Sequence, residues 1–143
     1  MGDFVHQDRD MIIDFTVFGM PQPKGSTRAF MRTGMKFPVV TSDNPKVKPW
    51  AELIKYEAQR HAPAGGVWTG AVHIIAEFYL VRPKHLPKRV VDHLTKPDLD
   101  KLLRAVKDAL KGVIYRDDSQ VTDVVTKKRY GPSPGVHIKV ATP

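Results

Sequence analysis

The segment KPDLDKLLRAVKDALKGVIYRDDSQV, residues 96–121, carries the most regular structural pattern in the chain. Its apolar residues recur three and four positions apart, which predicts an amphipathic helix with one face in a core. We expect this helix to begin at Leu99 and to close at Lys111 and Gly112, because both residue types are common at helix C-termini. The expected apolar stripe consists of Leu99, Leu102, Leu103, Val106, Ala109 and Leu110. The opposite face carries Asp100, Arg104, Lys107 and Lys111.

Two acidic pairs stand at the two ends of this predicted helix. Asp98 and Asp100 lie at its start, and Asp117 and Asp118 lie in the turn after its end. A helix of about a dozen residues spans roughly 18 Å, so residues 112–116 must double back if the pairs are to meet. A strand antiparallel to the helix would achieve this. Asp98 and Asp100 can converge only if Asp98 still has an extended or capping conformation.

Clustered carboxylates within a basic chain favour a divalent-metal site. Magnesium takes oxygen ligands and is usually held by one or two carboxylates together with substrate phosphate. When two metal ions act on a phosphodiester, one activates the attacking water and the other stabilises the leaving oxygen. Three or four aspartates at the ends of one helix can hold one or two such ions.

Each of these acids also has an ordinary structural interpretation. Asp98 can be a helix cap that answers the helix dipole, and Asp100 can pair with Arg104 one turn later. Asp117 and Asp118 can be turn residues, since aspartate is favoured there. Their joint occurrence at both ends of one helix, between basic segments, favours metal binding over these alternatives.

The remaining regular elements are four strands and a second helix. Alternation of apolar and polar residues predicts the strands, and it is most regular in residues 72–80. The expected strands cover residues 13–18, 72–80, 121–130 and 136–140. The second helix should start at Asn44-Pro45 or at Lys48-Pro49, because proline is tolerated in the first turn, and should end before Pro63.

Two stretches rich in proline and basic residues predict loops. Residues 20–34 predict a basic loop that leads into a hairpin returning through residues 35–40. Residues 81–97 predict a second basic loop, mobile when no ligand is bound. Basic residues in and around such loops are candidates for contact with DNA phosphates. These candidates are Lys24, Arg28, Arg32, Lys84, Lys88, Arg89, Lys101, Lys127 and Lys128.

The charge of the chain is strongly positive but unevenly distributed. The chain has 23 lysines and arginines against 15 aspartates and glutamates, a net charge of +8. Residues 98–123 carry five basic and six acidic residues, whereas residues 124–143 carry four basic residues and no acid. A basic excess of this size favours a polyanionic partner such as nucleic acid. The aspartates therefore form an acidic island in a basic protein.

Length and composition favour one domain over residues 1–143. The chain is 41% hydrophobic, which suffices for one globular core and not for two. No apolar run approaches the ~20 residues that a membrane helix needs, and the N-terminus lacks the pattern of a signal peptide. With no cysteine, disulfides and thiolate metal sites are excluded. We expect a cytoplasmic, nucleoid-associated protein with no membrane partner.

Three motifs follow one another in the second half of the chain. They are KPDLDKLL at residues 96–103, KDALKG at residues 107–112 and YRDDSQV at residues 115–121. In this order they resemble the core signature of the RusA family of Holliday junction resolvases. The earlier GMPQPKG, residues 19–25, resembles the proline-rich segment near the N-terminus of that family.

This resemblance implies an α/β (α+β) fold, a RusA-like mixed β-sheet with two main helices. It also implies a Mg²⁺-dependent homodimer that binds branched DNA and resolves four-way junctions by paired symmetric nicks during recombination and repair, with Mn²⁺ as a substitute ion. By position, Asp98, Asp100 and Asp118 match the metal-binding aspartates of the family. Asp117 lies beside them as a further catalytic candidate.

Two residues depart from the pattern of the family. Its members often have asparagine where this chain has Lys101, and a functionally important lysine where it has Arg104. Arginine can grip phosphate with two parallel hydrogen bonds but cannot readily give up a proton, so we expect Arg104 to stabilise charge. These departures leave open a non-catalytic, structure-selective DNA-binding protein. A nuclease that acts on flaps or on structured RNA is a third interpretation.

Overall fold

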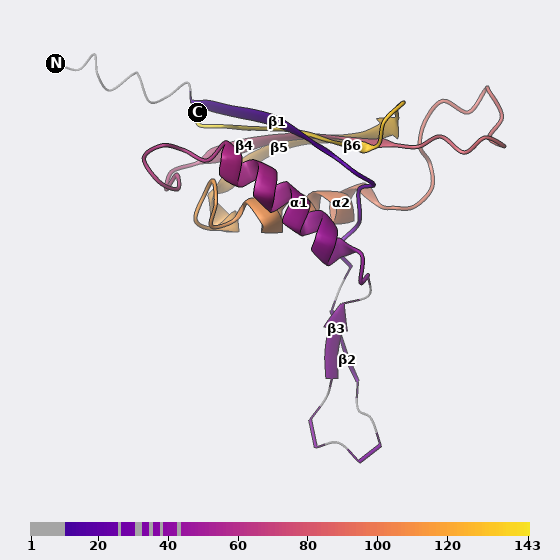
Figure 1. Cartoon of the computed structure of the whole chain (residues 1–143), viewed down its shortest axis with the longest axis horizontal. Coiled ribbons are helices and arrows are strands. Elements are labelled where there is room, and N and C mark those ends of the chain that lie inside the picture. The colour runs from indigo at the N-terminus through magenta and orange to yellow at the C-terminus, as the bar shows by residue number, and fades with distance from the viewer. Residues whose placement is uncertain (1–10, 26, 31–32, 35, 38, 43) are drawn as a thin grey trace.

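The computed structural model describes residues 11–25, 27–30, 33–34, 36–37, 39–42 and 44–143. Within these residues the chain forms a four-stranded sheet, a two-stranded hairpin and two helices (Figure 1). The sheet contains β1 (Ile12–Phe18), β4 (Val72–Leu80), β5 (Val121–Tyr130) and β6 (Gly135–Ala141). The hairpin contains β2 (Thr27–Phe30) and β3 (Val39–Ser42). The helices are α1 (Val47–Arg60) and α2 (Leu99–Leu110), and a short 3-10 turn, η2, covers Asp118–Gln120.

The four-stranded sheet is mixed, with the strand order β1-β6-β4-β5. β6 is antiparallel to both of its neighbours, whereas β5 is parallel to β4. A parallel pair needs a crossover connection, and the segment that contains α2 supplies it. Both helices lie on the same side of the sheet (Figure 1). These features confirm the predicted α+β fold with a mixed sheet and two helices in one domain.

The core forms between the sheet and the two helices. Alternate residues of β4 are buried, as the period-two pattern predicts: Val72, Ile74, Ala76, Phe78 and Leu80. α2 buries Leu102, Ala105, Val106, Ala109 and Leu110, and α1 buries Val47, Trp50, Ile54 and Ala58. α2 is therefore fixed to the sheet by its apolar stripe. Its polar face remains available to form a functional site.

Residues 112–116 form a tight turn in place of the antiparallel strand that we expected. Gly112 has φ +82°, a backbone conformation that glycine adopts readily, and its N–H donates to the carbonyl of Tyr115 at 2.7 Å. The N–H of Ile114 donates to the carbonyl of Leu110 at 3.0 Å. The chain thus reverses at once after α2, because these bonds close the turn without a strand.

One of the two predicted basic loops contains a strand, and the other has no regular secondary structure. β2 and β3 pair antiparallel, so strand replaces loop within residues 27–30, and the hairpin extends away from the sheet and helices (Figure 1). Residues 81–97 contain neither helix nor strand, as predicted. No helix in the described part of the chain has the length and apolar character that a membrane crossing requires.

Candidate active site

A pocket of 530 Å³ lies along the polar face of α2. It is lined by Lys24, Asp100, Leu103, Arg104, Lys107, Asp108 and Asp118. We call it the aspartate pocket. Five of the seven residues belong to α2, while Lys24 comes from the segment before β2 and Asp118 from η2. Two of the predicted metal ligands, Asp100 and Asp118, therefore share one pocket although they lie on either side of the turn.

Tyr115 holds Asp118 against α2. The ring of Tyr115 is fully buried, and its hydroxyl lies 3.0 Å from the carbonyl oxygen of Lys107 and 3.4 Å from Oδ1 of Asp118. Burial first, and the negative charge of Asp118 next, raise the pKa of the Tyr115 hydroxyl far above its usual value. The hydroxyl consequently keeps its proton and donates it to the carbonyl of Lys107, while its contact with Oδ1 of Asp118 is long and weak.

The polar residues of α2 line the aspartate pocket because of their spacing. Arg104, Lys107 and Asp108 follow Asp100 by four, seven and eight positions, which places them on one helix face. Asp100 and Asp108 are nevertheless about 12 Å apart along the axis, at 1.5 Å per residue. Among the described residues, no three acidic or histidine side chains lie close enough together to hold a metal ion. The carboxylates therefore form an elongated array.

Asp108 is a pocket residue that our sequence analysis missed. Its carboxylate forms an ion pair with the ammonium group of Lys24, which reaches the pocket from the proline-rich segment. The signal was present in the sequence, because Asp108 follows Asp100 by eight residues and Arg104 by four. The polar face predicted from the sequence does not include Asp108, which stands there only within the motif KDALKG.

Asp98 is the N-cap residue of α2 and has an extended conformation, with φ −71° and ψ 141°. This is the conformation that the sequence analysis required if Asp98 and Asp100 were to converge. The side chain of Asp98 makes no capping hydrogen bond. It lines a second pocket, together with Lys96 and Lys101, and does not line the aspartate pocket. Asp98 and Asp100 are thus neighbours in sequence that face two adjacent pockets.

Asp117 caps the turn that carries Asp118. Its carboxylate accepts hydrogen bonds from the N–H of Ser119 at 3.0 Å and from the hydroxyl of Ser119 at 2.6 Å. These bonds, followed by the charge of Lys111 at 3.5 Å, lower the pKa of the Asp117 carboxyl. The capping box is completed by Gln120, whose side chain accepts from the N–H of Asp117. Asp117 therefore has the turn role considered in the sequence analysis, and any catalytic role remains a prediction.

A comparison with known protein families covers the residues that line both pockets. A family model described as endodeoxyribonuclease RusA matches residues 20–141. This chain belongs to the RusA family. The RusA match spans the proline-rich segment, both helices and both pockets. The chain is also 33% identical over 138 residues to the Bacillus subtilis (strain 168) protein named "Uncharacterized protein YqaN", an alignment that covers 90% of this chain and 94% of that protein.

The basic residues that we predicted to contact DNA occupy different environments in the RusA chain. Lys84, Lys88, Arg89, Lys101 and Lys127 are exposed. Lys128 donates to the carbonyls of Thr95 at 2.7 Å and Pro97 at 3.0 Å, so it anchors the loop that precedes α2. For Arg28 the structure describes the backbone in β2, and Arg32 lies outside the described residues.

Proposed function

We propose that this member of the RusA family is a Mg²⁺-dependent nuclease that cleaves four-way DNA junctions. Family membership supplies the class of reaction, cleavage of DNA by an endodeoxyribonuclease. The observation that carries the proposal is the aspartate pocket, in which Asp100, Arg104 and Asp118 line one space. Hydrolysis of a phosphodiester needs oxygen ligands for a metal ion and a fixed cation for the developing phosphate charge, and this pocket provides both.

The donor groups of the aspartate pocket fit Mg²⁺. This ion is usually held by one or two carboxylates, several waters and substrate phosphate. Asp100 and Asp118 would hold it, and Asp98 in the adjacent pocket is the third candidate ligand. When bound, the ion would lower the pKa of the attacking water and stabilise the leaving oxygen. Mn²⁺ also suits carboxylate ligands, so it is expected to substitute.

The protein's own residues bind the phosphate and orient the carboxylates. Arg104 and Lys107 line the same wall as Asp100, so they can bind the oxygens of a phosphodiester placed in the pocket. An arginine side chain does not readily give up a proton, so charge stabilisation is the role proposed for Arg104. The hydroxyl of Tyr115 lies 3.4 Å from Oδ1 of Asp118, where an outer partner of a metal ligand would stand.

Symmetry and charge support the proposal of a four-way junction as substrate and of a homodimer as the active form. Two cuts related by a two-fold axis need two identical sites, which a closed dimer supplies. The net charge of +8 favours a branched polyanion, since more phosphates lie near the protein at a junction than along one duplex. The hairpin extends this surface, because residues 20–40 carry four basic residues and no acid. We therefore expect the protein to sediment as a homodimer.

Cleavage assays with Asp100→Asn test this proposal. Purified protein is incubated with labelled four-way junction, duplex and single strand, with and without Mg²⁺. The wild-type protein should make paired symmetric nicks in the junction only with Mg²⁺, and Asp100→Asn should abolish nicking while junction binding persists. Asp123→Asn is the matched control, because Asp123 lies exposed on β5 and lines neither pocket. Unchanged cleavage by Asp100→Asn would rule out its ligand role.

A non-catalytic DNA-binding protein is the second candidate function. The elongated array of aspartates, with no group of three close together in the described residues, is the observation that favours it. In that case the wild-type protein would bind the junction in preference to duplex but leave it intact with Mg²⁺ and with Mn²⁺. Nicks in flaps or in structured RNA, and none in junctions, would instead identify a different nuclease substrate.

A further inference from the structure

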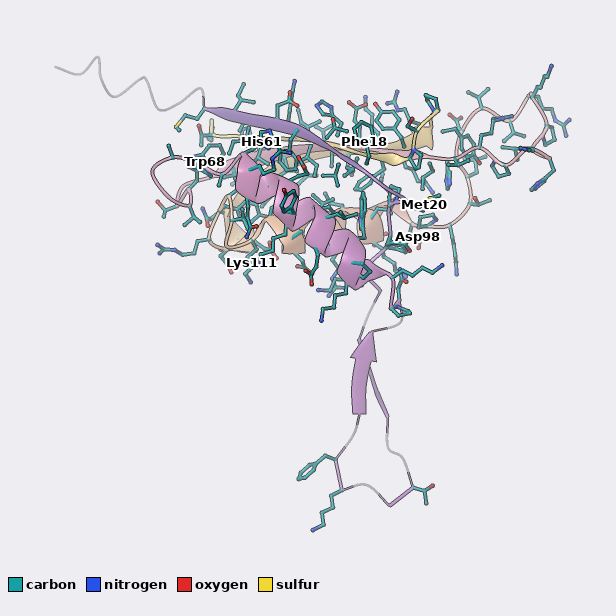
Figure 2. The ribbon with its side chains drawn as sticks, in the orientation of Figure 1. Phe18, Met20, His61, Trp68, Asp98 and Lys111 are labelled. Carbon is teal, nitrogen blue, oxygen red and sulfur yellow. The ribbon has the colours of Figure 1, made fainter. Side chains whose placement is uncertain are left out.

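A second pocket, of 480 Å³, lies beside the aspartate pocket. It is lined by Met20, Pro21, Gln22, Pro23, Gly25, Asn44, Leu80, Lys96, Pro97, Asp98 and Lys101. We call it the proline pocket. Figure 2 labels Met20 and Asp98, which come from two segments that close around it. Its volume lies within the range of about 300 to 1,000 Å³ that is usual for small-ligand sites.

The two pockets are lined by different residues in the first turns of α2. Asp98 and Lys101 line the proline pocket, and Asp100 lines the aspartate pocket. The segment before β2 also serves both, because Lys24 lines one pocket while its neighbours on either side line the other. The N–H of Lys24 donates to the carbonyl of Lys101 at 3.0 Å, which fixes this arrangement. A phosphodiester in the aspartate pocket therefore has its neighbouring nucleotide within reach of the proline pocket.

The walls of the proline pocket combine an apolar surface with one oriented amide. Met20, Pro21, Leu80 and Pro97 supply the apolar surface. The amide of Gln22 is held on one side, since Nδ2 of Asn44 donates to its Oε1 at 3.2 Å and to the carbonyl of Pro23 at 3.0 Å. Nε2 of Gln22 donates to the carbonyl of Met20 at a long 3.4 Å, a weak bond that is easily exchanged.

A nucleobase has the shape and polarity that these walls fit. Its two faces are apolar and stack on apolar side chains, while its edge carries hydrogen-bond groups that glutamine can recognise. Lys96 and Lys101 at the rim of the pocket supply positive charge for the phosphates on either side of that base. Bases at the branch point of a junction lack continuous stacking, so they are cheaper to extrude than bases within a duplex.

We propose that the proline pocket binds one unstacked nucleobase adjacent to the scissile phosphodiester, and that Gln22 reads its edge. This inference rests on the proposed function for the position of the phosphodiester. Its consequence is a base preference at the cut, imposed by a residue outside the aspartate pocket. Gln22 is a specificity residue in this scheme, and Asn44 is a positioning residue that acts through it.

A library of junctions tests the preference. Each junction carries one of the four bases beside the cut, and the rates of cleavage are compared at saturating protein. The wild-type protein should prefer one base, and Gln22→Ala should lower the ratio between the best and the worst base by about tenfold, the worth of one lost base contact. Gln59→Ala on the exposed side of α1 is the matched control and should keep the wild-type ratio. Equal rates for all four bases, or an unchanged ratio in Gln22→Ala, would overturn the proposal.

A binding assay separates this inference from the proposed function. Junctions that carry the fluorescent base 2-aminopurine beside the expected cut are titrated with protein in Ca²⁺. Unstacking should raise the fluorescence with the wild-type protein and with Gln59→Ala, and less with Gln22→Ala. If the wild-type protein leaves junctions uncut but raises this fluorescence, the proposed function fails and the base pocket stands. If it cuts junctions without any rise, the base pocket fails alone.

Discussion

Tyr115 is the residue that joins the two ends of the candidate site. Its hydroxyl bridges the carbonyl of Lys107 in α2 and the carboxylate of Asp118 in the turn that follows. The ring is fully buried, so the position of the hydroxyl is set by core packing and not by solvent. A phenylalanine there would fill the same space but leave Asp118 without this partner.

Tyr115→Phe should therefore weaken the binding of Mg²⁺ without unfolding the protein. We expect the Mg²⁺ concentration at half-maximal cleavage to rise by about tenfold or more, as is usual when an outer partner of a metal ligand is removed. The measurement is cleavage rate against Mg²⁺ concentration, with thermal unfolding in parallel. Tyr56→Phe is the control, because Tyr56 lies exposed on α1. An unchanged Mg²⁺ dependence with an altered melting temperature would assign Tyr115 a structural role alone.

Arg104 permits a second test at the same scale. If its charge binds the phosphate, Arg104→Lys should keep cleavage within about tenfold of wild type, whereas Arg104→Ala should lower it by about a hundredfold. Rates at saturating junction give this comparison. Equal losses in the two variants would mean that the geometry of the guanidinium, and not its charge, is what the reaction needs.

The sequence alone predicted part of the candidate site. Asp100 and Asp118 were predicted to meet, and they line one pocket because a buried tyrosine ties the turn to α2. That Asp98 would face the adjacent pocket could not be read from the sequence, since it depends on how the proline-rich segment packs over the first turn of α2. Asp108 was overlooked although its helical spacing was visible.

At the scale of elements, periodicity was a reliable guide wherever an element packs on the core. α2 and β4 expose one face and bury the other, so their patterns survive in the sequence. β2 and β3 were not predicted as defined strands because they pair only with each other, away from the sheet (Figure 1). The turn at residues 112–116 depends on local hydrogen bonds that leave no periodic signal.

Hydrogen bonds and a contact between two rings brace residues 81–97, and their predicted mobility without ligand stays a prediction. The guanidinium of Arg82 donates to the carbonyl of Val90 at 2.6 Å and to that of Pro87 at 2.7 Å. The ring of His93 is largely buried and lies 4.9 Å from the ring of Tyr130. Burial, and then the charge of Lys128, lower the pKa of His93 from its usual value of 6.5.

This histidine should make the protein less stable in acid. Because its pKa is lower in the folded protein, the unfolded chain binds the proton first as the pH falls below 6.5, so the free energy of unfolding decreases there. Urea unfolding at about pH 7.5 and about pH 5.5 measures the decrease. His93→Phe keeps a ring beside Tyr130 and should show a smaller decrease. The same decrease in both proteins would remove His93 as its source.

At the scale of the whole molecule, we expect positive charge to set how strongly DNA is bound and the two pockets to set where it is cut. Lys84 and Lys88 lie exposed on the loop before α2 and line neither pocket. Replacing both lysines by neutral residues should lower the affinity for DNA of any sequence, because phosphate contacts carry no sequence information. The base preference should stay unchanged.

Lys84→Gln combined with Lys88→Gln tests this division of roles. The logarithm of junction affinity, plotted against the logarithm of salt concentration, should lose about one unit of slope for each phosphate contact removed. Fluorescence anisotropy at several salt concentrations gives the slope, and cleavage at saturating protein should remain at the wild-type rate. Lys55→Gln on α1 serves as the control. A loss of cleavage at saturation would place these lysines in the reaction itself.

Lys24 ties the hairpin to α2 at two points, through its backbone N–H to Lys101 and through its ammonium group to Asp108. The segment that leads into the hairpin is therefore attached to α2 through both its backbone and a side chain. If the proposed function holds, we expect force from a DNA arm on the hairpin to pass through Lys24 to α2, the helix that carries Asp100.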